Sequence, residues 1–597
     1  MIDLLIQESL IKAFESLFGI ILEKNEVSLS NTKKEFEGDF TFVVFPFVKR
    51  IGKSPMDIAN QVGEYIIENM EEVESYNVIQ GFLNFKVSSA YWLGFVDENK
   101  DRVVFGYNSI REEKPVVIEY SSPNTNKPLH LGHIRNILLG WSISEILKAD
   151  GYAVRKVNLV NDRGIHICKS MLAWMKWGNG ETPESSGIKG DHLVGKYYVL
   201  FDEKNKDEII ALKKSGMSEE EAERSTKLLA EAQELLKKWE AGDEETIELW
   251  KKMNSWVYDG FDVTYERMGI DFDKIYYESD TYLLGKEIVS EGLEKDILNQ
   301  KDDGSIWADL SKEGLDEKLL QRGDGTSVYM TQDLGTAVSR HDDFDSDKLI
   351  YVVGNEQNYH FEVLKVVLQK LGYEWSDKLF HLSYGMVELP DGRMKSREGT
   401  VVDADDLIDE MIETARLQSI EHGKVDGFTE EELTKLYHTV AMGALKYFIL
   451  KVDPVRNMTF NPEESIDFNG NTGPFVQYTH ARIRSIIRKA EEEKSIQIAN
   501  FSIDKSIEIS DKEKEIIRIL YQYPKTIEQA ANTYSPALIA NYVYDLARAF
   551  NTFYQDSPIL REEDEEIMKL RLSLSSFVAN VIKTSMSLLG IRVPERM

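Results

Sequence analysis

Strand and helix patterns alternate in the middle of the chain. Residues 115–120 form a short apolar run that predicts a buried strand, followed by a loop rich in serine, proline and asparagine. Apolar residues at helical spacing over 134–147 predict a helix that Gly151 closes, and residues 154–160 predict a second strand. A similar strand-and-helix pattern returns at 348–354. This order predicts an α/β catalytic domain built on a Rossmann-like, doubly wound parallel sheet.

The regions on either side show different patterns of apolar residues. Residues 1–110 mix strand-like runs at 40–45 and 82–87 with a short helix, and they predict an α+β domain. The apolar positions of that helix are Leu4, Leu5, Leu10 and Phe14. Residues 431–597 show long helical spacing and few prolines, which predicts an all-α bundle.

The central region, residues 111–430, contains an insertion. It extends over about 165–310, and its highly charged middle, 219–252, predicts helices with solvated faces. A further strand-like run occupies 382–389. The chain therefore divides into three predicted domains: 1–110, 111–430 and 431–597.

Composition places the chain among globular proteins. Its 597 residues are too many for one hydrophobic core, and 42% apolar with 29% charged residues is ordinary for a folded protein. A single cysteine, Cys168, excludes a disulfide framework and favours a reducing compartment. No signal peptide is visible, and the most apolar stretch, 440–452, is interrupted by lysines and is too short for a bilayer. We expect a cytoplasmic protein without membrane contact.

The net charge of −32 does not exclude nucleic acid. Binding of phosphates depends on local basic patches and not on the sum over a long chain. One such patch is the predicted helix around 479–489, which carries four cations and no acid and follows Phe475 and Tyr478. Arginine and aromatic side chains suit unstacked RNA bases, although a solvated basic face is the simpler alternative.

The loop after the first strand, 121–133, is the most informative stretch. It ends in His130-Leu131-Gly132-His133 at the start of a predicted helix, where the helix N-terminus favours anions. Gly132 lets a base or ribose approach the backbone. A zinc site would need further ligands, which are not nearby, and two ordinary surface histidines are the other alternative.

Two further segments contain glycine and basic residues. The loop 391–400 contains Arg393, Lys395 and Arg397 and follows the strand-like run late in the same domain. The segment 190–197 has glycine and lysine at the spacing of a phosphate-binding loop, but Tyr197 replaces the magnesium-binding hydroxyl and no apolar strand precedes it. We do not expect it to bind phosphate.

Together the two loops resemble the class I aminoacyl-tRNA synthetases. His130–His133 matches the HIGH motif, and Arg393–Thr400 aligns with the KMSKS loop. The strings 119–124 and 329–334, with Lys127-Pro128 before the motif, are similar to the arginyl-tRNA synthetase family in particular. The resemblance covers nearly the whole chain. It implies that residues 1–110 contact the tRNA body and that residues 431–597 form a DALR-type anticodon-binding domain.

The second loop departs from the general pattern. Ser396 takes the place of the second lysine of KMSKS, with Lys395 and Arg397 on either side. Arginyl enzymes commonly lack that lysine, and the resemblance implies that Lys127 stands in for it. Which basic residue carries the charge stays open.

The resemblance implies a set of site residues. The residues expected to be catalytic are His130, His133, Lys127, Lys395 and Arg397. Those expected to bind ATP are Pro128, His130, Gly132, His133, Met394, Lys395 and Ser396. Those expected to bind arginine are Glu119, Ser121, Asn124, Tyr329, Asp333 and Gln357. Those expected to bind tRNA are Tyr478, Arg482, Arg484, Arg488, Phe82 and Asn84. Carboxylates and amide oxygens suit the five donors of a guanidinium group.

The implied function is ATP-dependent ligation of L-arginine to tRNA through an arginyl-adenylate. ATP is a substrate, Mg²⁺ is expected on its phosphates, no structural metal is expected, and we expect a monomer. Another synthetase of the class, a small nucleotidylyltransferase with the same first motif, and a non-catalytic RNA-binding descendant are the alternatives. The 160-odd helical residues at the end argue against the second, and the intact first motif argues against the third.

Overall fold

A computed structural model describes residues 1–597 except 34, 389, 391–401, 422–426 and 499–500. Tertiary contacts divide the chain into two compact units, and neither is contiguous in sequence. One contains Met1–Phe105, Ile483–Tyr521 and Arg548–Val581, and the other contains Gly106–Arg482, Gln522–Ala547 and Ile582–Met597.

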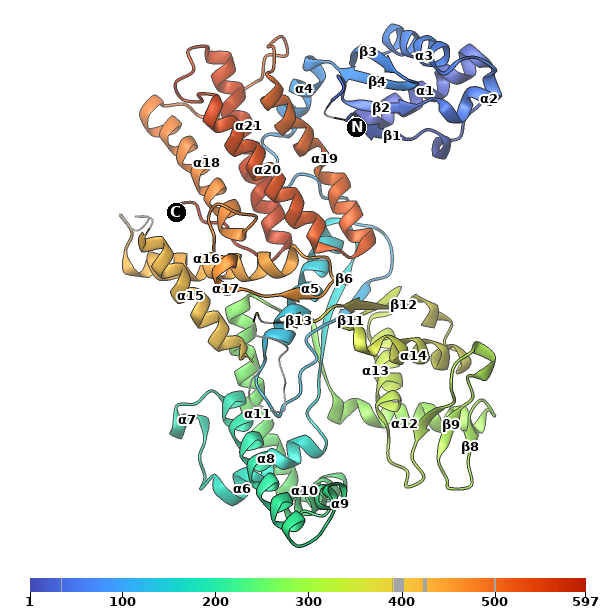
Figure 1. Ribbon diagram of the computed structural model, residues 1–597, viewed down its shortest axis with the longest axis vertical. Coiled ribbons are helices and arrows are strands. Elements are labelled where there is room, and N and C mark those ends of the chain that lie inside the picture. The colour runs from blue at the N-terminus through green and yellow to red at the C-terminus, as the bar shows by residue number, and fades with distance from the viewer. Residues whose placement is uncertain (34, 389, 391–401, 422–426, 499–500) are drawn as a thin grey trace. The chain divides into compact units, whose positions relative to one another are not determined.

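A five-stranded parallel sheet lies at the centre of the larger unit (Figure 1). Its spatial order is β12 (Leu379–Tyr384), β11 (Lys348–Gly354), β5 (Val116–Glu119), β6 (Val154–Val160) and β7 (Lys274–Tyr277). Every neighbouring pair is parallel. From β5 the chain adds β6 and β7 on one side of β5 and later adds β11 and β12 on its other side. The direction in which strands are added therefore reverses between β5 and β11. Ligands of doubly wound sheets bind outside the carboxyl ends of the strands at this switch point. The predicted fold class is confirmed.

Helix α5 (Leu131–Ala149) follows β5 and is buried on nearly all sides. Its buried residues include the polar Arg135, Asn136, Ser142 and Ser144 as well as its apolar ones, so the helix lies within the core without being apolar all round. Gly140 permits its close approach to the sheet, because a Cβ there would lie 2.3 Å from the Cβ of Tyr120. All five strands contribute buried residues to one apolar core, to which three further helices also belong. These are α12 (Glu278–Glu294), α13 (Tyr329–Phe344) and α14 (Asn358–Lys370).

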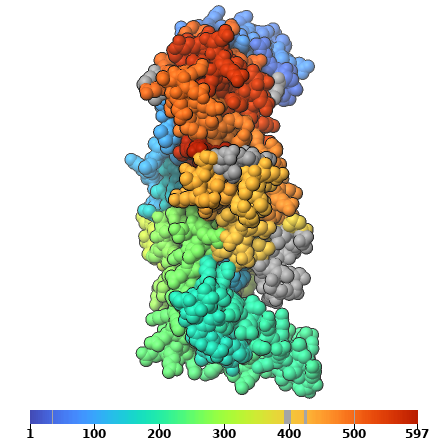
Figure 2. All heavy atoms as spheres, turned by 90° about the vertical axis from the view of Figure 1, so that its left-hand side faces the viewer, coloured from blue at the N-terminus to red at the C-terminus, as the bar shows by residue number. Residues whose placement is uncertain are grey.

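The insertion after β6 is helical, as its sequence predicts, and forms the surface coloured cyan to green in Figure 2. It contains α6 (Ile165–Trp177), α7 (Pro183–Ser186), α8 (Gly190–Lys214), α9 (Glu219–Arg224), α10 (Lys227–Glu240) and α11 (Glu244–Met268). In α10 the residues Leu228, Ala232, Leu235 and Trp239 are buried, and the charged residues lie on the other face. The glycine-lysine segment 190–197 is the first two turns of α8 and not a phosphate-binding loop. A small antiparallel sheet follows, formed by β8 (Asn299–Gln300), β9 (Ile306–Ala308) and β10 (Lys318–Gln321).

The strand-like run 382–389 is divided in the structure. Strand β12 ends at Tyr384, and β13 (Val387–Glu388) leaves the sheet to pair with β14 (Met458–Thr459). At Gly385 the chain passes so near another segment that a Cβ would lie 2.5 Å from the carbonyl carbon of Arg456. Apolar alternation could not reveal this change of partner, because it depends on a contact with a distant segment.

The last part of the chain is helical. Its helices are α15 (Ala404–Glu421), α16 (Glu430–Leu450), α17 (Pro462–Ser465), α18 (Gly473–Lys494), α19 (Asp511–Thr533), α20 (Pro536–Asp556) and α21 (Glu565–Leu588). The final residues belong to the sheet-containing unit: Ser142 Oγ donates to Leu588 O at 2.8 Å, and buried Lys446 Nζ donates to Gly590 O at 2.6 Å. Within the described part of the chain, no helix combines the length and the apolar character needed to cross a membrane.

The smaller unit begins with a four-stranded antiparallel sheet. Its order is β1 (Leu29–Asn31), β2 (Phe40–Val43), β4 (Phe82–Val87) and β3 (Val73–Ile79). The accompanying helices are α1 (Ile2–Phe18), α2 (Val48–Ile51), α3 (Pro55–Asn69) and α4 (Ser89–Asn99).

Two details of this unit differ from the sequence prediction. Helix α1 buries Ile2, Ile6, Leu10 and Phe14, whereas Leu4 and Leu5 are exposed. The strand predicted over 40–45 ends at Val43, before a 3₁₀ turn that contains Pro46, a residue that cannot donate to a sheet. The unit also includes part of α19, from which Lys514 Nζ reaches the buried carboxylate of Asp39 at 3.1 Å.

Candidate active site

The loop between β5 and α5 has a strained backbone held by two amide side chains. Ser121 and Ser122 have φ of 77° and 47°, in the left-handed region that non-glycine residues rarely adopt. The backbone N–H of Ser121 donates to Asn136 Oδ1 at 2.6 Å, and that of Ser122 donates to Asn158 Oδ1 at 3.0 Å. Strain of this kind persists where the surroundings fix it, and it is concentrated at functional sites. The Ser121 hydroxyl is buried against Tyr265, with 2.6 Å between the two oxygens.

The two histidines of the first motif lie side by side at the N-terminus of α5. Their ring centroids are 3.9 Å apart. The Gly132 N–H donates to His130 Nδ1 at 3.1 Å, and the His130 N–H donates to His133 Nδ1 at 3.2 Å. A Cβ on Gly132 would lie 3.0 Å from the His130 ring, so this glycine also leaves room for the imidazole.

Both imidazoles are neutral at neutral pH. Burial, reinforced by the nearby Lys127 ammonium, lowers the pKa of His130 to about 3, and burial with His130 and Lys127 lowers the pKa of His133 well below its usual value. Because Nδ1 accepts a hydrogen bond in each ring, the proton of each neutral ring is on Nε2. The pair therefore offers two N–H donors beside the helix N-terminus, an arrangement suited to anionic oxygens.

Lys127 lies where three cavities of the larger unit meet. The sheet-edge cavity, about 610 Å³, extends from Lys127, His130 and His133 to the carboxyl ends of β11 and β12. The polar cavity, about 430 Å³, is lined by Lys127, Asn124 and Tyr329 among others. The insertion cavity, about 260 Å³, is lined by Lys127 and His130 together with residues of α8. Burial lowers the pKa of Lys127.

The sheet-edge cavity lies at the topological switch point. Its walls include Val352 and Val353 from β11 and Met386 and Val387 beyond β12. Asn136 connects its two sides, since its Nδ2 donates to Val352 O at 2.6 Å while its Oδ1 holds the loop after β5. Apolar walls with imidazole and ammonium donors at one end suit a purine nucleotide.

The residues expected to bind arginine are only partly brought together. Asn124 and Tyr329 line the polar cavity, but Asp333 and Gln357 are not among the lining residues of the three cavities. The Asp333 carboxylate lies 2.5 Å from His360 Nε2, and Gln357 is exposed. Buried Glu119 faces buried Arg340, and it accepts a hydrogen bond from Ser122 Oγ at 2.6 Å.

Sequence reasoning missed Glu278, the first residue of α12. It lies at the carboxyl end of β7 and lines the polar cavity beside Gln332. Burial, with contributions from Asp162 and Asp333, raises its pKa to about 7 despite the opposing charge of Arg163. An acid with a strongly raised pKa in a cleft is a candidate functional group. Its position after a short strand of the sheet was the available signal, but that strand lies within the predicted insertion.

Of this region, the structure describes only the segment that follows the second motif. Met394, Lys395, Ser396 and Arg397 lie outside the described residues, as does the rest of 391–401. The next segment pairs with the first motif: the Leu131 N–H donates to Val402 O at 3.1 Å, and the Ala404 N–H donates to Leu129 O at 3.0 Å. Pro128 lines the insertion cavity beside them.

The residues expected to bind tRNA have mixed surroundings. Tyr478, Arg482, Arg484 and Arg488 are half-buried on α18, and the Arg482 guanidinium lies 4.8 Å from the Tyr478 ring centroid. In the smaller unit Phe82 is exposed, whereas Asn84 is buried and bonded within the sheet to Thr41 and Asn77.

The doubly wound sheet, its first motif at the switch point and the helices that follow define a class I aminoacyl-tRNA synthetase. Three families match: "tRNA synthetases class I (R), catalytic domain" at residues 100–462, "DALR anticodon binding domain" at 476–597 and "Arginyl tRNA synthetase N terminal domain" at 3–87. The chain belongs to the arginyl-tRNA synthetase family, and the resemblance seen in the sequence is confirmed.

Relatives agree with this assignment, and two solved structures share the fold. An arginine–tRNA ligase of Parabacteroides distasonis is 57% identical over 99% of this chain and 98% of that protein. One of Porphyromonas gingivalis is 55% identical over 99% of each. The structure of Thermus thermophilus arginyl-tRNA synthetase has a TM-score of 0.80 at 24% identity, covering 100% of both chains. That from Plasmodium falciparum has a TM-score of 0.75 at 22% identity, covering 100% of this chain and 99% of that one.

Proposed function

We propose that this chain ligates L-arginine to its tRNA in two ATP-dependent steps. The arginine carboxylate attacks the α-phosphorus of ATP, and arginyl-adenylate and pyrophosphate are formed. A hydroxyl of the terminal tRNA ribose then attacks the activated carbonyl, and AMP leaves. The observation that carries this proposal is the meeting of the sheet-edge and polar cavities at Lys127, beside two neutral imidazole donors.

ATP is assigned to the sheet-edge cavity. Its volume of about 610 Å³ and the apolar residues from β11 suit the nucleoside, and Lys127, His130 and His133 lie at the end suited to the phosphates. The Nε2–H groups of the two histidines would donate to oxygens on which charge develops as the pyrophosphate leaves. Donors already held in place cost no reorganisation during the reaction, and no protein nucleophile is needed.

Arginine is assigned to the polar cavity. Asn124, Glu278, Tyr329 and Gln332 place two amides, a carboxyl and a phenol on its walls. A guanidinium group has five donors and always carries its charge, so an ionised Glu278 is the strongest partner among them. Guanidinium binding would also favour ionisation of Glu278, since an adjacent positive charge lowers the pKa of a carboxyl.

The remaining assignments follow from this function. Residues 1–110 would contact the tRNA body, the catalytic domain would extend over 111–430, and the helical region 431–597 would bind the anticodon. We expect Mg²⁺ to be held by the ATP phosphates, because Mg²⁺ keeps several waters and usually binds with substrate phosphates. We further propose a monomer that works in the cytoplasm, where tRNA and a reducing milieu for Cys168 are found.

The test compares arginine with citrulline, its neutral isostere. In the presence of tRNA, purified protein should exchange pyrophosphate into ATP and release AMP with arginine. Citrulline should support these reactions about 10⁴-fold less well, because a site built to hydrogen-bond a substrate group rejects analogues that lack it. Exchange stimulated more strongly by another amino acid would contradict the proposal.

A further inference from the structure

The segment Val402–Ala404 forms a short antiparallel pairing with the first motif. His130 and Asp403 are bridge partners, and the hydrogen bonds to Leu129 and Leu131 lie on either side of them. Val402 O thus satisfies the first N–H of α5, at the same helix end where the His130 ring sits. The position of the His130 backbone therefore depends on what holds this segment.

Asp405, just beyond the pairing, is held by hydrogen bonds from residues of the insertion. Its Oδ2 accepts from Lys189 Nζ at 2.6 Å and from Thr264 Oγ1 at 3.0 Å, and its Oδ1 accepts from Arg267 Nη1 at 2.8 Å. Asp405 is only 7% exposed, so these bonds are shielded from water. Burial raises the pKa of Asp405, but the nearby His192 and the bonds from Lys189 and Thr264 outweigh it and keep the pKa well below its usual range. The residue is a buried, charged anchor.

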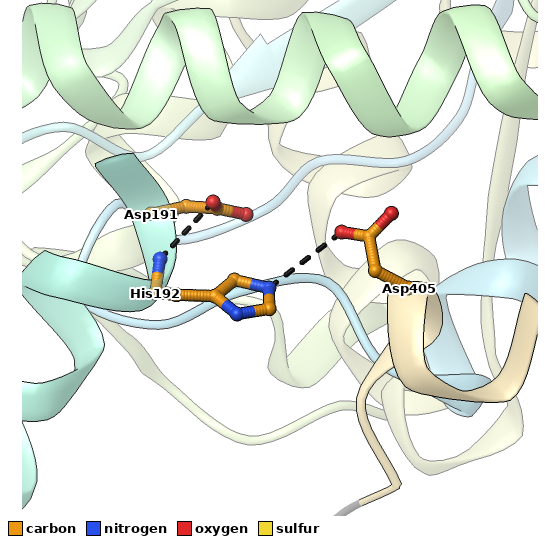
Figure 3. Close-up of side chains that lie close together, drawn as sticks. All are labelled: Asp191, His192 and Asp405. Atoms are coloured by element: carbon orange, nitrogen blue, oxygen red, sulfur yellow. Dashed lines mark hydrogen bonds and ion pairs between the residues drawn. The ribbon is translucent and has the colours of Figure 1, made fainter. Parts of the chain in front are cut away.

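His192 extends the anchor to Asp403. Figure 3 shows Asp191 and His192 at the start of α8, with the imidazole turned toward Asp405 at the start of α15. His192 Nε2 lies 3.3 Å from Asp403 Oδ2 and 3.6 Å from Asp405 Oδ2. Asp403 in turn accepts from the N–H groups of Asp405 and Asp406 at the start of α15. One imidazole therefore lies near both Asp403, within the paired segment, and Asp405, just beyond it.

A lysine supplies the positive charge at the centre of this cluster. The ligand atoms of Asp191, His192 and Asp405 lie within 4.8 Å of one another, a spacing that a metal ion could use. Lys189 Nζ, however, lies 3.0 Å from Asp191 Oδ2 and 2.6 Å from Asp405 Oδ2. Its ammonium already bridges the two carboxylates, so the cluster is an ion-pair network.

We propose that Asp405, held by Lys189, Thr264 and Arg267 of the insertion, is a positioning residue for arginine activation. It fixes Val402–Ala404 along residues 129–131 and so sets the place of His130. The helical insertion acts through this contact on the first motif. The inference rests on the proposed function.

The central test is Asp405→Asn, with Asp409→Asn as the matched control. Arg267 pairs with both acids through different nitrogens, but the Asp409 side chain is 68% exposed whereas that of Asp405 is 10% exposed. We expect Asp405→Asn to lower kcat for arginine-dependent, tRNA-supported exchange by about 10–100-fold, because a misplacement of about 1 Å can cost that much. The KM for arginine should change less than about twofold, since the polar cavity is not touched. Asp409→Asn should match the wild type.

Titration of the active sites separates positioning from folding. If Asp405 has a merely structural role, Asp405→Asn should lower the number of active sites and leave kcat per active site unchanged. That result would overturn the proposal. Equal kcat in Asp405→Asn and Asp409→Asn would overturn it as well. A wild-type protein that shows no arginine-dependent exchange would instead contradict the proposed function.

His192→Gln decides the matter if Asp405→Asn does not fold. The charged groups facing His192 are Lys189, Asp191, Asp403 and Asp405, with Arg267 beyond Asp405. The nearby Asp405 carboxylate is the largest influence and raises the pKa of His192, against the opposing effect of burial. In the wild type, kcat should fall as pH rises through that raised pKa and the imidazolium is lost. His192→Gln should lack this step. An identical pH profile in both proteins would refute the role of His192 in the anchor.

Discussion

Glu119→Gln tests whether the carboxylate at the end of β5 serves the fold or the substrate. Glu119 Oε2 pairs with Nη1 of Arg340, whose side chain is 1% exposed and whose guanidinium lies 5.4 Å and 5.3 Å from the ring centroids of Tyr276 and Tyr351. Burial lowers the pKa of Arg340, but Glu119 and the two tyrosines outweigh it, so its net pKa is raised. Glutamine would leave a buried guanidinium without its counterion.

The expected loss can be converted into a melting shift. Removing one partner of a buried pair costs about 3–5 kcal/mol. The sheet-containing unit has roughly 420 residues, which corresponds to an unfolding entropy of about 0.9 kcal/mol per degree. Glu119→Gln should therefore lower the Tm of this unit by about 3–6 °C. Differential scanning calorimetry on the full chain measures the shift.

Two variants sharpen the measurement. Asp345→Asn removes an exposed carboxylate that pairs with exposed Lys114 in the same unit, and it should change Tm by less than about 1 °C. Glu119→Gln combined with Arg340→Met removes both charges and should recover most of the loss. A Tm for Glu119→Gln equal to that of Asp345→Asn would refute the reasoning. If Glu119 binds arginine directly, the double variant should also lose the stabilisation that added arginine gives the wild type.

Three other predictions concern the site and the chain end. Because the pKa of Glu278 is raised to about 7, its carboxyl ionises as pH rises through that value. The KM for arginine should fall over the same pH interval. In Glu278→Gln, the KM for arginine should not show this pH dependence. His133→Ala should lower kcat for adenylation about 10²–10³-fold, the loss typical of one preorganised donor, with KM for ATP changed only a few-fold; a change in KM alone would contradict the role. Deleting residues 582–597 removes the acceptor of Ser142 Oγ and one of the two carbonyl acceptors of Lys446 Nζ, which keeps its bond to Met268 O. Each buried donor left unpaired costs about 1–3 kcal/mol, so the shortened chain should be cleaved faster in limited proteolysis, and equal resistance would show that the end is dispensable.

Local patterns determined the central strands and the first motif. Strands β6 and β11 have the predicted bounds. The apolar run of β11 is typical of a strand buried on both faces of a parallel sheet, whereas Arg155, Lys156 and Asn158 interrupt the apolar residues of β6. The position of the motif at the start of α5 was predicted equally well, because the residues of the loop end there and apolar residues at helical spacing begin. The order of these strands and helices was enough to predict a parallel sheet, because the connection between two parallel strands allows few topologies.

Only the tertiary structure decided which polar groups face one another. Glu119 meets Arg340, Asp405 meets Lys189 and Arg267, and Glu278 reaches the polar cavity from the start of α12. The last residues of the chain likewise complete the unit that contains the sheet. Periodicity records which side of an element is buried, but not what covers it, because the partner is chosen by the path of the chain through space. Burial then fixes the charge and pKa of each group, so the chemistry of the site depends on contacts that no local stretch of sequence contains.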